Sequence, residues 1–243
     1  MASSGEIASR VFIEFQVLNE KELAERVAMW ERGKGFFERH RKAFGWTGLD
    51  EGTKEAVKEA YLGNPAWAAA GDILLEEPQH ARERLVVELD WERCPKTCEN
   101  FAALISGEKG MSKTRARGAQ VPLHYKGTPV FRVEPGVLFQ SGDVTRGDGS
   151  GGESIWNKRF NDEKEGLRKR HDRRGLVGMA NSGKNSNTSQ FYVTLAPLPK
   201  LDGRHVLFGT VVDGLSARSL VENADLSTSK VIISDCGLLS NSC

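Results

Sequence analysis

Hydrophobic and polar residues at the start of the chain first alternate as in a β-strand and then recur as on a helical face. Residues 11–17 combine β-branched and aromatic side chains in partial alternation, which predicts a strand. Residues 19–44 are rich in Glu, Lys, Arg and Ala, and apolar side chains fall on one helical face at Leu23, Val27 and Trp30. We expect a helix that Asn19 caps and that Gly33 and Gly35 interrupt.

A second helical segment follows before strand character returns at residue 85. Thr53 can cap this helix, which ends near Leu62 because Gly-Asn-Pro comes next. The aromatic side chains of the region are expected to pack among its helices and onto the host domain, with a partner-binding surface as the alternative: Trp30, Phe36, Phe37, Phe44, Trp46 and Trp67. The pattern predicts three parts: a tail and first strand at 1–17, a helical insertion at 18–83, and the remainder of the domain at 84–243.

Short apolar runs separated by glycine-rich segments fill the chain after residue 90. The runs lie at 129–139, 175–180, 191–195, 205–212 and 230–233. Such spacing is typical of an antiparallel barrel or sandwich, so we expect a mainly β fold. One helix is expected after Pro95, where Cys98, Phe101, Ala102 and Ile105 share a face.

Composition excludes several classes of protein. Among 243 residues, 34 Lys and Arg balance 33 Asp and Glu, so no basic excess attracts nucleic acid or an anionic membrane. No apolar run reaches the length of a membrane span and the first residues lack a signal peptide, so we expect a cytoplasmic protein. Cys94 and Cys98 have no second ligand pair at zinc spacing, so we expect buried free thiols and no metal.

A basic stretch at residues 168–174 has two interpretations. Its sequence, RKRHDRR, is compatible with a nuclear address or a nucleic-acid patch. The acidic residues Glu163, Glu165 and Asp172 dilute its charge and favour a solvated loop. We therefore expect no nucleic-acid partner and keep a nuclear location as the alternative to the cytoplasm.

Six motifs occur in a fixed order in the β-rich part of the chain. They are PKTCENF (95–101), FRVEPGVLFQSGD (131–143), GSGGESI (149–155), GMANSG (178–183), NTSQFYVT (187–194) and LDGRHVLFG (201–209). Together they closely resemble the cyclophilins, the peptidyl-prolyl cis-trans isomerases. The resemblance covers about 84–240 and the strand at 11–17. It implies an eight-stranded antiparallel β-barrel closed by two helices, here with a helical insertion between the first two strands.

The reaction that this resemblance implies defines what the site must contain. An X-Pro bond rotates over a barrier of about 18–20 kcal/mol because amide resonance is broken. The catalyst needs a pocket for the proline ring, a cation that hydrogen-bonds the prolyl nitrogen, and polar groups that hold the backbone. Arg132 suits the second task because a guanidinium stays charged and presents a rigid fork of donors. The resemblance makes it the principal catalytic residue, with no cofactor.

The resemblance also assigns the other residues of the site. Gln140 would hydrogen-bond the substrate backbone and orient the arginine, Asn181 would grip the peptide main chain, and His205 would line the proline pocket. Taken alone, Asn181 is equally typical of a turn. The remaining substrate-binding residues are expected to be Val137, Leu138, Ala180, Ser182, Gln190, Tyr192 and Leu201. The expected partners are proline-containing peptides or proteins, and a monomer is the default.

Several pocket positions depart from the family pattern. Val137 and Tyr192 stand where the family usually has phenylalanine, Leu138 where it has methionine, and Phe131 where it has histidine. Loss of one aromatic contact at Val137 removes about 0.5–1.5 kcal/mol, so we expect turnover reduced by about one or two orders of magnitude. Lys200 replaces the tryptophan that contacts cyclosporin, which predicts weak binding of that drug. The alternative function is a non-catalytic proline-peptide-binding or scaffold module.

Overall fold

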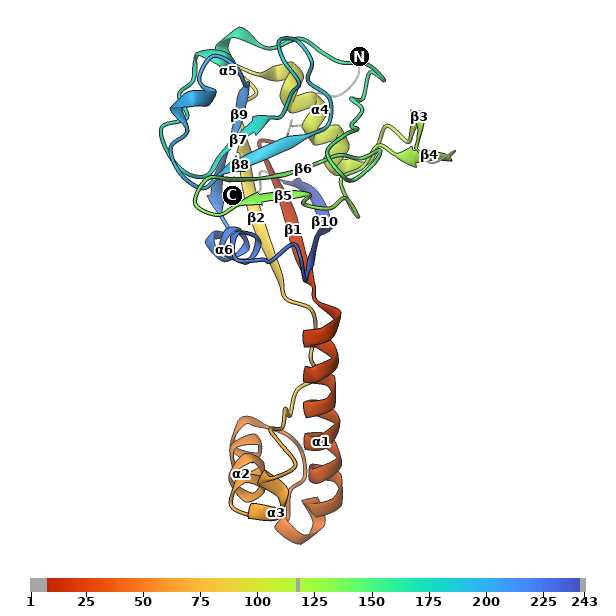
Figure 1. Cartoon of the computed structure of the whole chain (residues 1–243), viewed down its shortest axis with the longest axis vertical. Coiled ribbons are helices and arrows are strands. Elements are labelled where there is room, and N and C mark those ends of the chain that lie inside the picture. Colours follow the sequence, from red (N-terminus) through yellow and green to blue (C-terminus); the bar gives the residue numbers. More distant parts are fainter. Residues whose placement is uncertain (1–7, 117–118, 241–243) are drawn as a thin grey trace. The chain divides into compact units, whose positions relative to one another are not determined.

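The computed structural model describes residues 8–116 and 119–240. It divides into two compact units: Asn19–His80, called here the helical unit, and Met1–Leu18 with Ala81–Cys243, called the barrel unit. Figure 1 shows that the helical unit contains α1 to α3 and that the barrel unit contains every labelled strand.

The barrel unit is built on one eight-stranded sheet in which all neighbouring strands are antiparallel. The strand order is β10-β1-β2-β9-β7-β8-β6-β5. The bounds are β1 (Arg10–Leu18), β2 (Arg82–Leu89), β5 (Arg132–Glu134), β6 (Leu138–Ser141), β7 (Leu176–Met179), β8 (Phe191–Thr194), β9 (Leu207–Asp213) and β10 (Lys230–Leu239). Just before β5, Gly127 and Val130 donate backbone hydrogen bonds to β10 at 2.7 and 2.9 Å, so the two ends of the strand order meet. The predicted eight-stranded antiparallel fold is confirmed.

Two longer helices pack against this sheet. Helix α4 (Pro95–Ser106) contacts β1 and β10, and α6 (Leu215–Glu222) contacts β1 and β2. The core between α4 and the strands is dominated by buried aromatic rings: Phe15, Phe101, Tyr125, Phe139, Phe191 and Phe208. The sequence predicted α4 from its apolar face, and this helix buries Cys98, Phe101 and Ile105 as expected.

Several local elements differ from the sequence prediction. The apolar run at 129–139 splits into β5 and β6 because the chain turns at Gly136, which has a φ of 69°. The segment after α4 forms a hairpin of β3 (Met111–Ala116) and β4 (Ala119–Pro122), followed later by the short helices α5 (Lys164–Arg168) and η1 (Pro199–Leu201). Cys94 and Cys98 are buried free thiols, and burial raises the pKa of Cys94 to about 12.

The helical unit has a hydrophobic core of its own. It consists of α1 (Glu20–Phe44), α2 (Glu51–Leu62) and α3 (Pro65–Ala68), whose core residues are Phe36, Phe37, Val57, Tyr61 and Leu75, with Trp46 and Trp67 packed against them. Four of the six predicted aromatic residues thus pack in or on this core. Phe44 is 50% exposed but stacks on Trp46 with ring centroids 4.6 Å apart, and Trp30 lies under Lys34. Within the described ranges, no helix is both long and apolar enough to serve as a membrane span.

Of the two predicted helix caps in this unit, one is confirmed and one is wrong. Asn19 caps α1, since its Oδ1 accepts a hydrogen bond from the Glu22 N–H at 3.1 Å, as predicted. The predicted Thr53 cap of α2 is wrong. Asp50 takes that role, because its Oδ1 accepts the Thr53 N–H at 2.7 Å and the helix therefore starts at Glu51.

The prediction that Gly33 and Gly35 interrupt α1 is also wrong. The helix is continuous to Phe44, and the Leu74 N–H donates to the Met29 carbonyl at 3.1 Å, so the returning chain crosses α1 at Gly33. A Cβ on Gly33 would overlap the Leu74 carbonyl oxygen, whereas the nearest atom to a Cβ on Gly35 is 3.9 Å away, in Arg39. Gly33 therefore serves a close backbone approach rather than a helix break.

The two glycines should respond in opposite directions to alanine. Gly33→Ala is expected to destabilise the helical unit by about 1–3 kcal/mol because backbone atoms must move apart. Gly35→Ala is expected to stabilise it by about 0.5–1 kcal/mol, since alanine is the better helix former and the site is open. Native-state hydrogen exchange of the α1 amides measures both free energies. Equal stability of the two variants would contradict the close approach at Gly33.

Candidate active site

Four strands bring residues from distant parts of the sequence into one row across the sheet. Arg132 of β5 lies opposite Gln140 of β6, Gln140 opposite Tyr192 of β8, and Tyr192 opposite Gly178 of β7. Directly opposed residues of antiparallel strands project to the same face. The row therefore places the predicted cation, a predicted polar group and a predicted pocket wall on one face.

An apolar cluster separate from the main core adjoins this row. Its members are Leu138, Tyr192 and Leu198, with Val137, Ala180 and Leu201 packed against them. Five of these six residues were predicted to bind substrate, all but Ala180 as walls around the proline ring, and Leu198 was not predicted. The His205 ring meets the Tyr192 ring edge to face, with centroids 5.7 Å apart. The structure thus brings the predicted walls of an apolar pocket together.

Arg132 lies at the surface with a carboxylate as its partner. Its Nε donates to Glu134 Oε1 at 3.0 Å, and its Nη2 donates a second hydrogen bond to the same oxygen. Both side chains are about half exposed, at 52% and 40%. An exposed ion pair contributes only about 0–1 kcal/mol, so a bound amide can take over donors that Glu134 now holds. The sequence analysis did not foresee this pair.

Two glutamines form the polar side of the site. Gln190 is buried, and its Nε2 donates to the carbonyl oxygens of Gly149 and Gly151, both at 2.8 Å. Its Oε1 accepts a hydrogen bond from Gln140 Nε2 at 2.9 Å, which orients the Gln140 amide. Both side chains line a groove of about 360 Å³ whose other predicted members are Ala180, Asn181 and Ser182.

A buried aspartate, which the sequence analysis missed, shapes the loop beside this groove. Asp143 Oδ1 accepts the N–H groups of Thr145 and Arg146, and its Oδ2 accepts those of Gly149 and Gly151 at 3.0 Å each. These bonds fix the loop whose carbonyls hold Gln190. The aspartate of the Gln-Ser-Gly-Asp motif was the one feature of the sequence that could have pointed to this role. Nothing local in the sequence shows which N–H groups it would bind.

The Asn181 side chain takes part in a turn. Its Oδ1 accepts the Gly183 N–H at 3.2 Å, and its Nδ2 donates to the Arg204 carbonyl at 3.2 Å. The adjacent Ser182 N–H donates to Ser186 Oγ at 2.9 Å. Asn181 therefore ties the groove to the segment that carries His205, and this is the turn role that the residue suggests when taken alone.

His205 is half buried, and one of its ring nitrogens has a backbone hydrogen-bond partner. Its Nδ1 lies 3.0 Å from the Met179 carbonyl oxygen, which can only accept, so Nδ1 carries the proton in the neutral ring. Burial lowers the pKa of His205 from its ordinary value of 6.5. The ring is therefore neutral at pH 7 and acts as a pocket wall.

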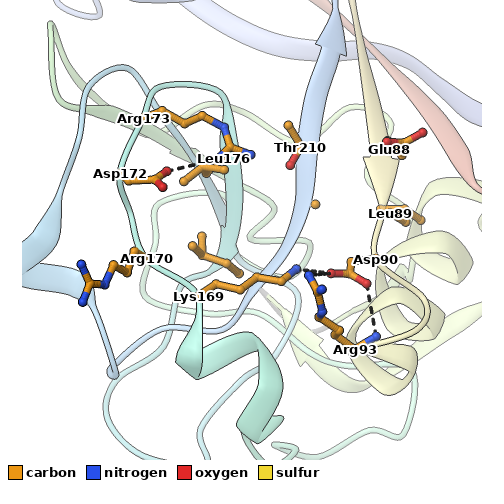
Figure 2. Close-up of a pocket in the computed structure, with 12 residues that line it drawn as sticks. Glu88, Leu89, Asp90, Arg93, Lys169, Arg170, Asp172, Arg173, Leu176 and Thr210 are labelled. Carbon is orange, nitrogen blue, oxygen red and sulfur yellow. Dashed lines mark hydrogen bonds and ion pairs between the residues drawn. The ribbon is translucent and has the colours of Figure 1, made fainter.

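A second groove, of about 420 Å³, lies at β2, β9 and the basic stretch at 168–174 (Figure 2). Figure 2 shows Lys169 and Arg93 both directed at Asp90, and Arg173 paired with Asp172. These cations are engaged by carboxylates of the same groove. The charged residues of the stretch face solvent or these carboxylates, as expected for a solvated loop, but His171 in its middle is buried.

The pH titration of His205 tests its burial. Because the native state resists protonation of His205, the unfolded state binds more protons once the pH falls below about 6.5. The free energy of unfolding therefore decreases as the pH is lowered from 6.5 through the pKa of the folded state. An NMR titration of the His205 ring proton is expected to give a midpoint below 6.5. A midpoint at or above 6.5 would show that the ring is not desolvated.

Comparison with known proteins identifies the family. The family model described as cyclophilin type peptidyl-prolyl cis-trans isomerase/CLD matches residues 75–238, so β1 and all three helices of the helical unit lie outside the match. The peptidyl-prolyl cis-trans isomerase cyp11 of Rhizopus delemar is 45% identical over 161 residues, which are 64% of this chain and 46% of that protein. The chain therefore spans about half the length of this relative. It belongs to the cyclophilin-type peptidyl-prolyl cis-trans isomerase family.

Proposed function

We propose that this protein catalyses cis-trans isomerisation of X-Pro bonds in peptides and flexible protein segments of the cytoplasm. The observation that carries the proposal is the single row of Arg132, Gln140 and Tyr192 beside an apolar cluster. The row offers a cation, a backbone-binding amide and a pocket wall within one face. The name of the Rhizopus relative supports the same activity.

The proposed mechanism needs only side chains of this chain. The apolar cluster and the neutral His205 ring hold the proline ring, while Gln140 holds the flanking backbone. As the amide twists, its nitrogen regains a lone pair, and the Arg132 guanidinium donates to it in exchange for Glu134. This interaction is stronger in the twisted state than in either planar isomer, which is the condition for lowering the barrier.

The pocket composition supports a lower turnover than that of typical family members. Val137 is aliphatic and only partly buried at the edge of the cluster, so the proline ring lacks an aromatic face there. We propose a reduction of about one or two orders of magnitude in kcat/KM. The NMR measurement of cis-trans exchange described below gives kcat/KM and so tests the size of this reduction.

Removal of the Arg132 guanidinium tests the activity. Cis-trans exchange of a short X-Pro peptide, followed by NMR, is expected to be accelerated by the wild-type protein and to slow by about 10²–10³-fold with Arg132→Ala, as for loss of a principal transition-state donor. Arg132→Lys keeps the charge without the planar fork and should fall between the two.

Arg10→Ala is the matched control for this experiment. Arg10 is equally exposed, at 55%, and also pairs with a glutamate, Glu88 at 3.3 Å. Its removal should leave exchange unchanged. If wild type and Arg132→Ala both shift the peptide resonances without exchange above the uncatalysed rate, the protein is instead a proline-peptide-binding or scaffold module, for which Val137 and Lys200 argue.

Weak cyclosporin binding is a separate prediction. Lys200 is exposed on η1 beside Leu201, where an aromatic ring would add contact area. Calorimetric titration is expected to give a Kd above about 1 μM for the wild type. Lys200→Trp should tighten binding about tenfold, whereas Lys58→Trp on α2 should not change it. Tight binding by the wild type would refute the prediction.

A further inference from the structure

The hydroxyl of Tyr192 contacts a buried histidine, His171, to which the sequence analysis assigned no role. Tyr192 Oη and His171 Nε2 are 2.7 Å apart, and both residues are at least 97% buried. On its other side, His171 Nδ1 lies 2.8 Å from Asp202 Oδ1. A carboxylate only accepts, so Nδ1 carries the proton, Nε2 is the acceptor, and the tyrosine hydroxyl donates to it.

His171 also holds the segment that carries η1 and Leu201. The His171 backbone N–H donates to Asp202 Oδ1 at 2.7 Å, and the Leu198 N–H donates to the His171 carbonyl at 2.7 Å. The two hydrogen bonds from His171 lower the pKa of Asp202, so this carboxylate is ionised at neutral pH. One residue therefore fixes both the tyrosine wall and the segment from Leu198 to Leu201 that packs on it.

The tyrosine is matched to its surroundings on the sheet as well. Gly178 lies opposite Tyr192 in the register of β7 and β8, and a Cβ on Gly178 would overlap the Tyr192 hydroxyl. The ring thus lies across a position that has no side chain. Burial raises the pKa of Tyr192 strongly, so its hydroxyl stays protonated and requires an acceptor. His171 is that acceptor among the residues the structure describes.

We propose that His171 is a positioning residue of the proline pocket, which holds Tyr192 through its Nε2 and the Leu198–Leu201 segment through Asp202. The inference rests on the proposed function and adds to it a residue that touches no substrate. Without the hydrogen bond between Tyr192 and His171, the ring at position 192 is no longer held in one orientation, and the pocket loses its fixed wall.

Three variants measured by peptide exchange test this proposal. Tyr192→Phe removes the donor. His171→Asn keeps an N–H near the Nδ1 position for Asp202 but removes the Nε2 acceptor. Each is expected to lower kcat/KM about tenfold, and the double variant also about tenfold, because both changes remove the same hydrogen bond. A double variant that loses about a hundredfold would overturn the proposal, as would single variants with wild-type kcat/KM.

Two controls match the chemistry of these changes. Tyr61→Phe removes another buried tyrosine hydroxyl, which donates to the Gly71 carbonyl at 2.9 Å in the helical unit. His124→Asn removes a ring in the barrel unit whose Nε2 lies 3.0 Å from the Ile105 carbonyl oxygen. Both controls should keep wild-type kcat/KM. Equal losses in the controls would assign the effect to general destabilisation and overturn the positioning role.

The nitrogen resonances of His171 supply a readout that does not depend on activity. A long-range ¹H–¹⁵N spectrum of the wild-type protein should show the Nδ1–H form, with Nε2 accepting. In Tyr192→Phe the Nε2 resonance should move toward that of a free imine nitrogen. A proton on Nε2, or no shift in the variant, would overturn the proposal. If the wild type fails to catalyse exchange, the proposed function fails while this spectrum still decides the role of His171.

Discussion

The two-residue alternation along β6 and β8 is the constraint on which the site depends. Phe139, Phe191 and Val193 point into the core and are fully buried, and burial of each such side chain contributes about 1.5–3 kcal/mol. Their neighbours Gln140 and Tyr192 must then project to the opposite face. A slip of one residue would expose the phenylalanines and bury the glutamine, so the core holds the register that assembles the site.

Two buried polar residues fix the loops that adjoin this row. Asp143 gathers backbone N–H groups of its own loop, and His171 gathers Leu198, Asp202 and the Tyr192 hydroxyl. An unsatisfied buried polar group costs about 1–3 kcal/mol, so each loop is stabilised in one conformation by the residue beneath it. Loops held in this way would suit the proposed reaction, whose catalyst must hold one side of a bond while the other turns.

The sequence predicted those parts of the molecule that local pattern and ordered motifs determine. The strands of the eight-stranded sheet, the α4 face, the Asn19 cap and the gathering of Val137, Leu138, Tyr192 and Leu201 follow from such signals, whereas the β3–β4 hairpin was not predicted. It failed where a distant segment decides. From the sequence alone, Gly33 indicates a helix break. In the structure it allows the Leu74 carbonyl to approach the backbone of α1. His171 lies in a stretch whose charges indicate solvent, but contacts with the distant residues Tyr192, Leu198 and Asp202 bury it.

The pairing of β1 with β2 explains how the fold tolerates so long an insertion. β1 and β2 are antiparallel neighbours, and the Val17 N–H donates to the Ala81 carbonyl at 3.0 Å at the end of the ladder. The insertion therefore replaces a hairpin connection whose two ends are already adjacent, and the entropy of closing a longer connection rises only slowly with length. The unit also has a hydrophobic core of its own around Phe36 and Tyr61, as a separately packed segment does. The residues proposed for the site at Arg132 all belong to the barrel unit, so the insertion lengthens one connection of the sheet without interrupting any strand that carries them.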